Sequence, residues 1–398
     1  MDFRLEPAKQ LVVSRFRGYV DRELLPLEPE FLATGFAAML PQLQARRAEV
    51  RRLGLWGPVY PREHGGLGLD LLTHGLISEA LGRCPFAHFV FGCNAPDAGN
   101  VELLHECATP AQKKRWLEPL AKGIVRSCFA MTEPGNSGAN PLMLETRAVQ
   151  DGGDWVLNGR KWFTTGADGA AFCILMAVTD PDAPAHGRAS LFIVPTDAAG
   201  YRLTRNTPVM GHAGSGLFSH GEIELEACRV PGDQLVGARG EGFRLAQARL
   251  GPGRIHHCMR WLGICERALE LMVARAATRV IAPDGRRLGD SDIVRAWIAE
   301  CAAEILAARL LVLHAAARVG AEGASAARDE IAMIKFHVAG VMQRVLDRAI
   351  QVHGGLGVTD YTLLAWFWRE ERAARIYDGP DEVHKIAVAK RLLKGSGG

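Results

Sequence analysis

A single aspartate near the C-terminus, Asp378, is the residue of this sequence best suited to acid–base chemistry. It stands in the segment RIYDGPDEV at positions 375–383. A carboxylate can take a proton from a substrate if the fold brings it within hydrogen-bond reach of that proton. An aspartate before a glycine is also common in turns and at helix N-termini. The residues alone therefore leave two interpretations of Asp378, a general base or a capping residue.

Four further segments carry small, hydroxyl-bearing and aromatic residues in a fixed order along the chain. They read QKKRWLEPL at 112–120, CFAMTEP at 128–134, NGRKWFTTG at 158–166 and QVHGGLG at 351–357. Thr132 offers both a hydroxyl and a backbone donor, and small residues such as Gly354 allow a close backbone approach to a ligand. Together with the Asp378 segment, the order and separation of these strings resemble those of the acyl-CoA dehydrogenase family.

The resemblance implies a reaction, a cofactor and a base. Family members remove the α-proton of an acyl-CoA thioester with a carboxylate, and FAD takes the hydride of the β-carbon because no side chain can accept it. A backbone N–H at the base residue and a ribityl hydroxyl of the flavin bind the thioester oxygen. Most members have glutamate at the position of Asp378, so the carboxylate here is one methylene shorter. The resemblance implies a catalytic Asp378 and a substrate site that contains Arg254, Asp378 and Gly379.

The resemblance also implies the residues that bind FAD, which in the family lies between the sheet domain and the C-terminal helices and is completed by a neighbouring subunit. If 158–166 is a strand, Trp162 points to the opposite face from Phe163. Arg279 is followed by residues that depart from the family pattern, Pro380 replaces a hydroxyl-bearing residue, and Asn140 replaces an acidic one. The implied cofactor-binding residues are Phe129, Met131, Thr132, Gly138, Ala139, Phe163, Thr165, Arg279, Gln351, Gly354, Gly355 and Glu382.

Some members of the family place the base on a helix, directly before an arginine. The matching position here is Gly253, which has no side chain to act, before Arg254. Arg254 is a candidate for orienting the base or the substrate, and a charge on a helix surface is the alternative interpretation. The strings CNAPDAGN at 93–100 and GPGRIHHCMR at 251–260 further resemble the branch that in animals is fused to a kinase-like domain. The shorter base and this branch imply a pocket that is wider beyond Cβ, for long, branched or 4-hydroxy (or 4-phospho) acyl chains.

The hydrophobic pattern divides the chain into three stretches, which we predict as an α+β multidomain protein. Residues 1–125 carry helical patterns broken by glycine and proline, and form a predicted N-terminal α-helical domain. Residues 126–235 form a predicted middle β-barrel or sandwich domain, with strands at 172–178, 190–194 and 222–226 and a turn at 151–154. Residues 236–398 form a predicted C-terminal four-helix bundle, with apolar stripes at 262–272, 293–311 and 331–350 and a last helix after Asp378.

Composition excludes several classes of function. A net charge of +3, with lysine and arginine scattered, gives no surface for nucleic acid or for an anionic membrane. No apolar run approaches the roughly 20 residues of a membrane helix. Nine cysteines without a CxxC pair indicate reduced thiols and no zinc ribbon. The adjacent histidines 256 and 257 point about 100° apart on a helix and make a poor metal site, so we expect packing roles and no metal. The acidic N-terminus is unlike a secretory leader, and we expect a cytoplasmic protein.

The expected function is FAD-dependent dehydrogenation of an acyl-CoA to a trans-2-enoyl-CoA, with electrons passed to an electron-transfer flavoprotein. Flavin contacts from two subunits imply a homodimer or homotetramer. One alternative is a flavin oxidase or monooxygenase of the same superfamily that reacts with O2, as nitroalkane oxidase does. A second alternative is a non-catalytic assembly factor that binds acyl-CoA or flavin.

Overall fold

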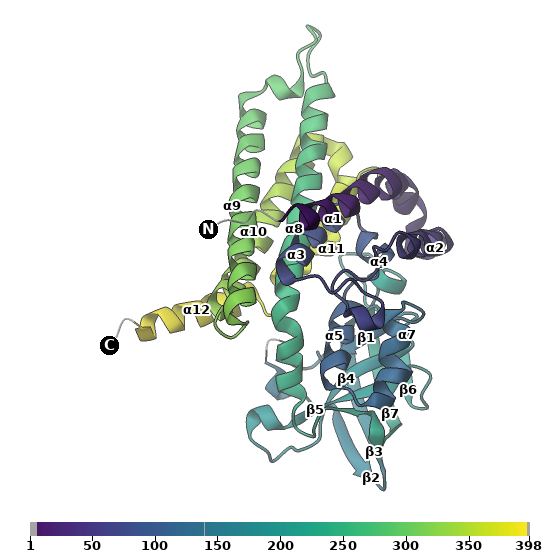
Figure 1. Ribbon diagram of the computed structural model, residues 1–398. Helices are drawn as coiled ribbons and strands as arrows, with labels where there is room; N and C mark the ends of the chain where they lie inside the picture. Colours follow the sequence, from purple (N-terminus) through teal and green to yellow (C-terminus); the bar gives the residue numbers. More distant parts are fainter. Residues whose placement is uncertain (1–5, 139, 396–398) are drawn as a thin grey trace. The chain divides into compact units, whose positions relative to one another are not determined.

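The computed structural model describes residues 6–138 and 140–395 (Figure 1). Along the chain a helical region is followed by a sheet and then by long helices, which confirms the predicted fold class. The contacts divide the chain into two compact units. Unit 1 comprises Met1–Gly35, Leu69–His88 and Gly251–Gly398, and unit 2 comprises Phe36–Gly68 and Phe89–Leu250. The boundaries 1–125, 126–235 and 236–398 stay predictions.

Unit 2 contains one mixed sheet, which holds eight strands within the described residues. The order along the sheet is β6-β7-β3-β2-β4-β5-β8, and β1 pairs with β4. The pairs β1–β4 and β2–β4 are parallel, and the other pairs are antiparallel. The strands are β1 (Ser127–Ala130), β2 (Arg147–Asp151), β3 (Asp154–Thr165), β4 (Phe172–Val178), β5 (Ala189–Pro195), β6 (Tyr201–Asn206), β7 (His220–Pro231) and β8 (Leu235–Val236).

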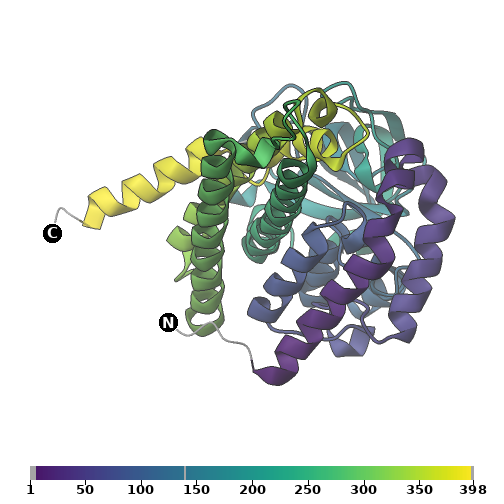
Figure 2. The same cartoon turned by 90° about the horizontal axis from the view of Figure 1, so that it is seen from above.

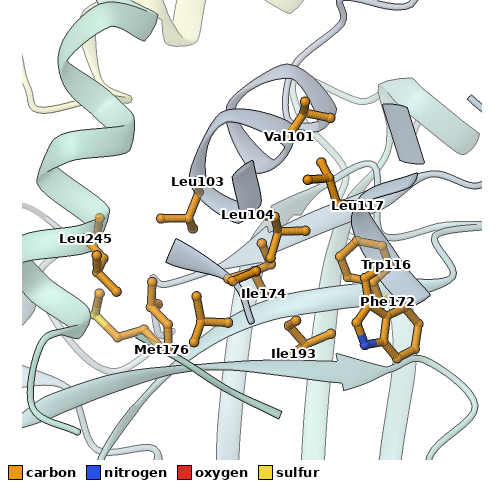
Figure 3. Close-up of a cluster of buried hydrophobic side chains, with 14 of the residues drawn as sticks. Val101, Leu103, Leu104, Trp116, Leu117, Phe172, Ile174, Met176, Ile193 and Leu245 are labelled. Carbon is orange, nitrogen blue, oxygen red and sulfur yellow. The ribbon is translucent and has the colours of Figure 1, made fainter. Parts of the chain in front are cut away.

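Strand β4 is buried on both faces, as its continuous apolar sequence predicts. Its side chains alternate between two clusters: Phe172, Ile174 and Met176 pack on one face, and Cys173 and Leu175 on the other. The first cluster is covered by two short helices, α5 (Asp97–Cys107) and α7 (Glu118–Ala121), and Figure 3 shows Leu103, Leu104 and Trp116 over the strand. This packing fixes β1, the neighbour of β4, from which the CFAMTEP segment continues.

A buried ion pair joins that segment to β3. Lys161 is fully buried, and its Nζ lies 2.8 Å from Oε1 of Glu133 and 3.0 Å from the carbonyl oxygen of Met131. The Glu133 carboxylate also accepts the backbone N–H groups of Glu145 and Thr146. Burial alone would raise the pKa of Glu133, but the Lys161 charge and these hydrogen bonds lower that pKa to about 2. The pair therefore fixes the position of residues 131–133 relative to the sheet.

The remaining helices of unit 2 are α6 (Pro110–Gln112) and the part of α2 (Glu28–Arg52) after Gly35. Gly35 has φ +77° and interrupts α2 at the boundary between the units. The short α4 (Ala87–Val90) crosses the boundary after His88, and α8 (Gly242–Thr278) crosses the boundary after Leu250.

Unit 1 is built of long helices. In Figures 1 and 2 the unit 1 part of α8 runs beside α9 (Asp292–Glu322) and α10 (Arg328–His353). Helix α12 (Asp381–Gly395) packs on α10 and extends outward. These are the four predicted C-terminal helices. The unit also contains α1 (Pro7–Tyr19), α3 (Leu71–Gly82) and α11 (Leu363–Glu371), and α11 was not predicted. No helix in the described part of the chain is long and apolar enough to cross a membrane.

We predict that Glu133→Gln lowers the free energy of unfolding by about 3–5 kcal/mol, because removal of one partner leaves the buried Lys161 charge uncompensated. The pKa of Glu133 is depressed from 4.5, so its stabilisation is present above about pH 4.5 and is lost as the pH falls toward 2. Urea unfolding at neutral pH measures the loss. The exposed Arg229–Asp151 pair is the control, and Asp151→Asn should cost about 0–1 kcal/mol. Equal losses in the two variants would contradict this account.

Candidate active site

Asp378 lies in a tight turn between the end of a short helical segment and α12. The chain leaves the 3₁₀ turn Arg372–Arg375, and the backbone N–H of Tyr377 bonds to the carbonyl oxygen of Ala373. Asp378 then adopts φ +54° and Gly379 φ +93°, and α12 begins at Asp381. A positive φ is uncommon for a residue other than glycine and persists only where surrounding contacts hold it. The Asp378 side chain is 17% exposed.

Two side chains hold the backbone of this turn through one oxygen atom. The guanidinium of Arg254 donates from Nε and Nη2 to the Asp378 carbonyl oxygen, at 3.2 and 3.1 Å. His384 donates to the same oxygen from Nε2 at 3.0 Å. A Cβ atom on Gly379 would lie 2.8 Å from that His384 nitrogen, so glycine is required there on steric as well as conformational grounds. The structure thus brings together all three residues predicted for the substrate site.

The Asp378 carboxylate meets a residue that sequence reasoning assigned to packing. Nδ1 of His257 lies 2.8 Å from Oδ2 of Asp378. The neighbouring His256 points elsewhere, and its Nε2 lies 3.2 Å from Nδ1 of His74. The signal that could have found His257 is its spacing from Arg254 and Trp261: positions separated by three and four residues share one helix face.

A second set of contacts fixes the residues on either side of Asp378. The Tyr377 hydroxyl lies 3.1 Å from both Arg260 Nη2 and Trp261 Nε1, and Glu371 binds all three side chains. On the other side, Asp381 is buried, and its carboxylate lies 3.5 Å from Lys335 Nζ and 2.8 Å from Arg375 Nε. Charged groups therefore fix the turn at both ends.

The residues predicted to contact the flavin ring gather in unit 2, where CFAMTEP meets β3. Thr132 donates from its hydroxyl to the Trp162 carbonyl oxygen at 2.9 Å, and the Trp162 N–H bonds back to the Thr132 carbonyl oxygen. The Thr165 hydroxyl lies 3.0 Å from His220 Nδ1. Gly138 is exposed, and a Cβ atom there would lie 3.1 Å from the Thr132 methyl group. Ala139 lies outside the described residues.

The prediction that Trp162 and Phe163 point to opposite faces is wrong. The register of β3 on β7 shifts between Lys161 and Thr164, and Phe163 adopts φ +49°. This bulge breaks the alternation of the strand, so that the two rings lie 4.6 Å apart. Phe163 is 45% exposed. A strained, exposed aromatic side chain beside a second ring offers a flat apolar surface, which fits the ring system of a flavin.

A buried network of polar side chains around Asp97 supports Phe129, and no role was predicted for this network from the sequence. The buried carboxylate of Asp97 accepts both the N–H and the hydroxyl of Ser127. Asn100 donates to Ser127 Oγ at 2.9 Å, and Arg249 donates to Asn100 and lies 4.3 Å above the Phe129 ring. The segment 93–100 thus fixes the start of β1, the strand that carries Phe129.

Three of the remaining predicted cofactor residues lie far from Asp378 within unit 1. Gln351, Gly354 and Gly355 are exposed at the C-terminal end of α10, whereas Lys335 near its start contacts Asp381. At 1.5 Å per residue, the two regions are separated by about 24 Å along α10. Arg279 is exposed just after α8 ends. Glu382 is exposed in the first turn of α12, directly after the turn at Asp378. The structure does not bring Gln351, Gly354 and Gly355 together with that turn.

Comparisons with known proteins decide the family. The acyl-CoA dehydrogenase N-terminal, middle and C-terminal domains match residues 6–124, 128–228 and 240–393. The chain belongs to the acyl-CoA dehydrogenase family. The predicted resemblance is thereby confirmed, and membership of the family makes FAD the cofactor.

Similarity to individual proteins supports the assignment to this family. Probable acyl-CoA dehydrogenase FadE2 of Mycobacterium tuberculosis is 43% identical over 89% of this chain and 86% of that protein. Acyl-CoA dehydrogenase family member 10 of Mus musculus is 38% identical over 98% of this chain, which spans only 37% of the mouse protein. A solved structure of a candidate acyl-CoA dehydrogenase from Mycobacterium abscessus is 37% identical, with a TM-score of 0.94 and coverage of 99% and 100% of the two chains. The predicted likeness to the animal branch is confirmed.

Proposed function

We propose that this acyl-CoA dehydrogenase family member oxidises an acyl-CoA thioester to a trans-2-enoyl-CoA, with Asp378 as the base that removes the α-proton. The observation that carries the proposal is the turn at Asp378, in which three side chains hold one carboxylate-bearing residue in a strained conformation. When bound, FAD supplies the acceptor for the hydride of the β-carbon. The rest of the proposal concerns what the residues of this chain do.

Asp378 combines two requirements of a base for a weak carbon acid. Its side chain is largely shielded from water, so the carboxylate that would take the α-proton is kept in a site with little competing solvent. Its backbone belongs to the same turn, so the Asp378 N–H can bind the thioester oxygen on which charge develops. The base and the oxyanion donor then belong to the same rigid turn, and their relative position is fixed before the substrate binds.

Arg254 serves this arrangement by holding the backbone and by its charge. Burial lowers the pKa of Arg254, and the Asp378 charge partly offsets that effect. Its two donor nitrogens bind the carbonyl oxygen of Asp378 and not its carboxylate. The carboxylate therefore stays available to take the α-proton. We therefore place Arg254 and Gly379 in the substrate site as the residues that set the direction of the base.

The proposal extends to the acyl chain and to the electron acceptor. The shorter base supports a pocket that accepts substituents beyond Cβ, and an electron-transfer flavoprotein is the proposed acceptor. Anaerobic bleaching of the flavin should be compared for straight, branched and 4-hydroxy acyl-CoAs of equal length. Reduction by acyl-CoA that is followed by rapid peroxide formation in air would favour the oxidase instead. A flavin that no acyl-CoA reduces would favour the non-catalytic assembly factor.

We predict that Asp378→Asn abolishes flavin bleaching by acyl-CoA while FAD stays bound, because the amide keeps the shape but takes no proton. A positioned base contributes roughly 10²–10⁴-fold, and stopped-flow reduction under nitrogen should show a loss of this size. The control is Asp360→Asn, which changes an exposed aspartate of the same unit and should leave the rate unchanged. Turnover of the Asp378 variant within about tenfold of wild type would place the base elsewhere.

We predict that the holoenzyme is a homodimer or homotetramer. The flavin residues at the far end of α10 are exposed and separated from Asp378, so they suit the flavin of a second subunit. Exposed leucines on α9, Leu306 and Leu310, and on α12, Leu392 and Leu393, give apolar surface for association. Light scattering coupled to flavin absorbance measures the mass. A monomer that carries one FAD per chain would contradict the prediction.

A further inference from the structure

The contact between His257 and Asp378 has a feature that simple packing does not explain. His257 Nδ1 is shielded from solvent, lies 2.8 Å from the carboxylate oxygen, and makes no hydrogen bond of good alignment. Buried polar atoms are nearly always paired, and the exceptions call for a specific reason such as a catalytic role. A buried imidazole nitrogen in contact with the proposed base has such a reason.

We propose that His257 orients the Asp378 carboxylate toward the α-proton of the substrate. The proposal rests on the proposed function, because it assigns a partner to that base. His257 touches the base and not the substrate, so it is a positioning residue.

The shorter side chain of Asp378 gives the reason for a partner. Relative to glutamate it lacks one C–C bond of about 1.5 Å. A carboxylate on a short stem has few orientations, and a misplacement of about 1 Å can cost on the order of a hundredfold in rate. Contact of Oδ2 with the His257 ring fixes the rotation of the carboxylate, while Arg254 and His384 fix the backbone below it.

The His257 ring is itself held in place. It packs edge-on against Tyr377, with ring centroids 5.7 Å apart, and lies 6.2 Å from the ring of Trp261. The Tyr377 hydroxyl and the Trp261 N–H are in turn fixed by Glu371 and Arg260. Aromatic rings therefore pack around the imidazole and restrict its rotation away from the carboxylate.

The test compares the limiting rate of anaerobic flavin reduction by acyl-CoA in His257→Leu and His257→Asn. Leucine fills similar space without a polar atom, whereas asparagine keeps a polar amide near the position of Nδ1. We expect equal FAD content and equal substrate affinity in both variants. The limiting rate should fall by about 10- to 100-fold in His257→Leu and by less in His257→Asn, because the amide can still contact the Asp378 carboxylate. The control is His186→Leu, which changes an exposed histidine outside the site and should leave the rate unchanged.

A His257→Leu variant that reduces its flavin at the wild-type rate would overturn the proposal, and so would an equal loss of rate in His257→Asn. If His257→Leu does not fold with FAD, His257→Gln serves for the same measurement. A wild-type flavin that no acyl-CoA reduces would instead refute the proposed function, so the two failures are distinguishable.

A different observation, on the surface of unit 2, points to a metal site. His64 Nε2 and His105 Nδ1 lie 3.1 Å apart, and Oε1 of Glu63 lies 3.5 Å from each of them. Ligands of a tetrahedral zinc ion with bonds of 2.0–2.1 Å lie about 3.4 Å apart, so the three atoms match one face of its coordination shell.

We infer that Glu63, His64 and His105 bind a zinc ion that joins the loop at 57–68 to α5. His64 lines a cavity of about 700 Å³, which gives an ion and a water ligand access from solvent. The fourth position of the ion is then free for water, as in zinc sites with three protein ligands.

Titration of the metal-free holoenzyme with zinc chloride in a calorimeter tests the site. We expect one zinc per chain, binding at least tenfold weaker in His105→Gln, and a zinc-dependent rise in melting temperature that this variant loses. His186→Gln changes an exposed histidine elsewhere in unit 2 and should leave both readouts as in wild type. Equal zinc affinity in wild type and His105→Gln would overturn the inference.

Discussion

The proposed active site depends on a single carbonyl oxygen, that of Asp378. Arg254 and His384 donate to it from two helices, α8 and α12, and so hold the backbone at φ +54° where an aspartate alone would relax. A strained conformation of this kind costs on the order of 1–3 kcal/mol, and several contacts are needed to maintain it. Because the backbone is held there, the carboxylate and the N–H of Asp378 both point in fixed directions. A general base and an oxyanion donor both require such fixed directions.

Buried ion pairs at two places serve the same purpose in the rest of the chain. Lys161 and Glu133 hold the CFAMTEP segment against β3, and Lys335 and Asp381 hold the start of α12 against α10. Such pairs contribute little net stability because desolvation offsets the attraction, but breaking one is costly. They act as positional constraints: each fixes a segment that carries site residues to an element whose own position is set by apolar packing.

The sequence predicted those parts of the structure that depend on local pattern. The apolar run at 172–178 forms β4, and the stripes at 293–311 and 331–350 lie in α9 and α10. These elements could be predicted because the spacing of apolar residues along the chain indicates which side chains are buried. The bulge at Phe163 was missed because it depends on the pairing of β3 with β7. His257 was missed because its partner lies 121 residues later, and only the folded chain brings them together. The predicted roles of the flavin residues stay predictions.

One face of α8 suits an aspartate as the proposed base. Gly253 and His257 are four residues apart and lie on the same face of the helix, with Arg254 beside them. A Cβ atom at Gly253 would meet no atom within 4 Å, so that position is open where the resemblance places the base of some family members. His257, one turn later, meets the carboxylate of the base that comes from the turn at Asp378. A glutamate at 378 would extend about 1.5 Å further into the position of the imidazole ring. The short base and the histidine therefore fit each other, and changing either alone would leave a gap or a clash at the atom that takes the proton.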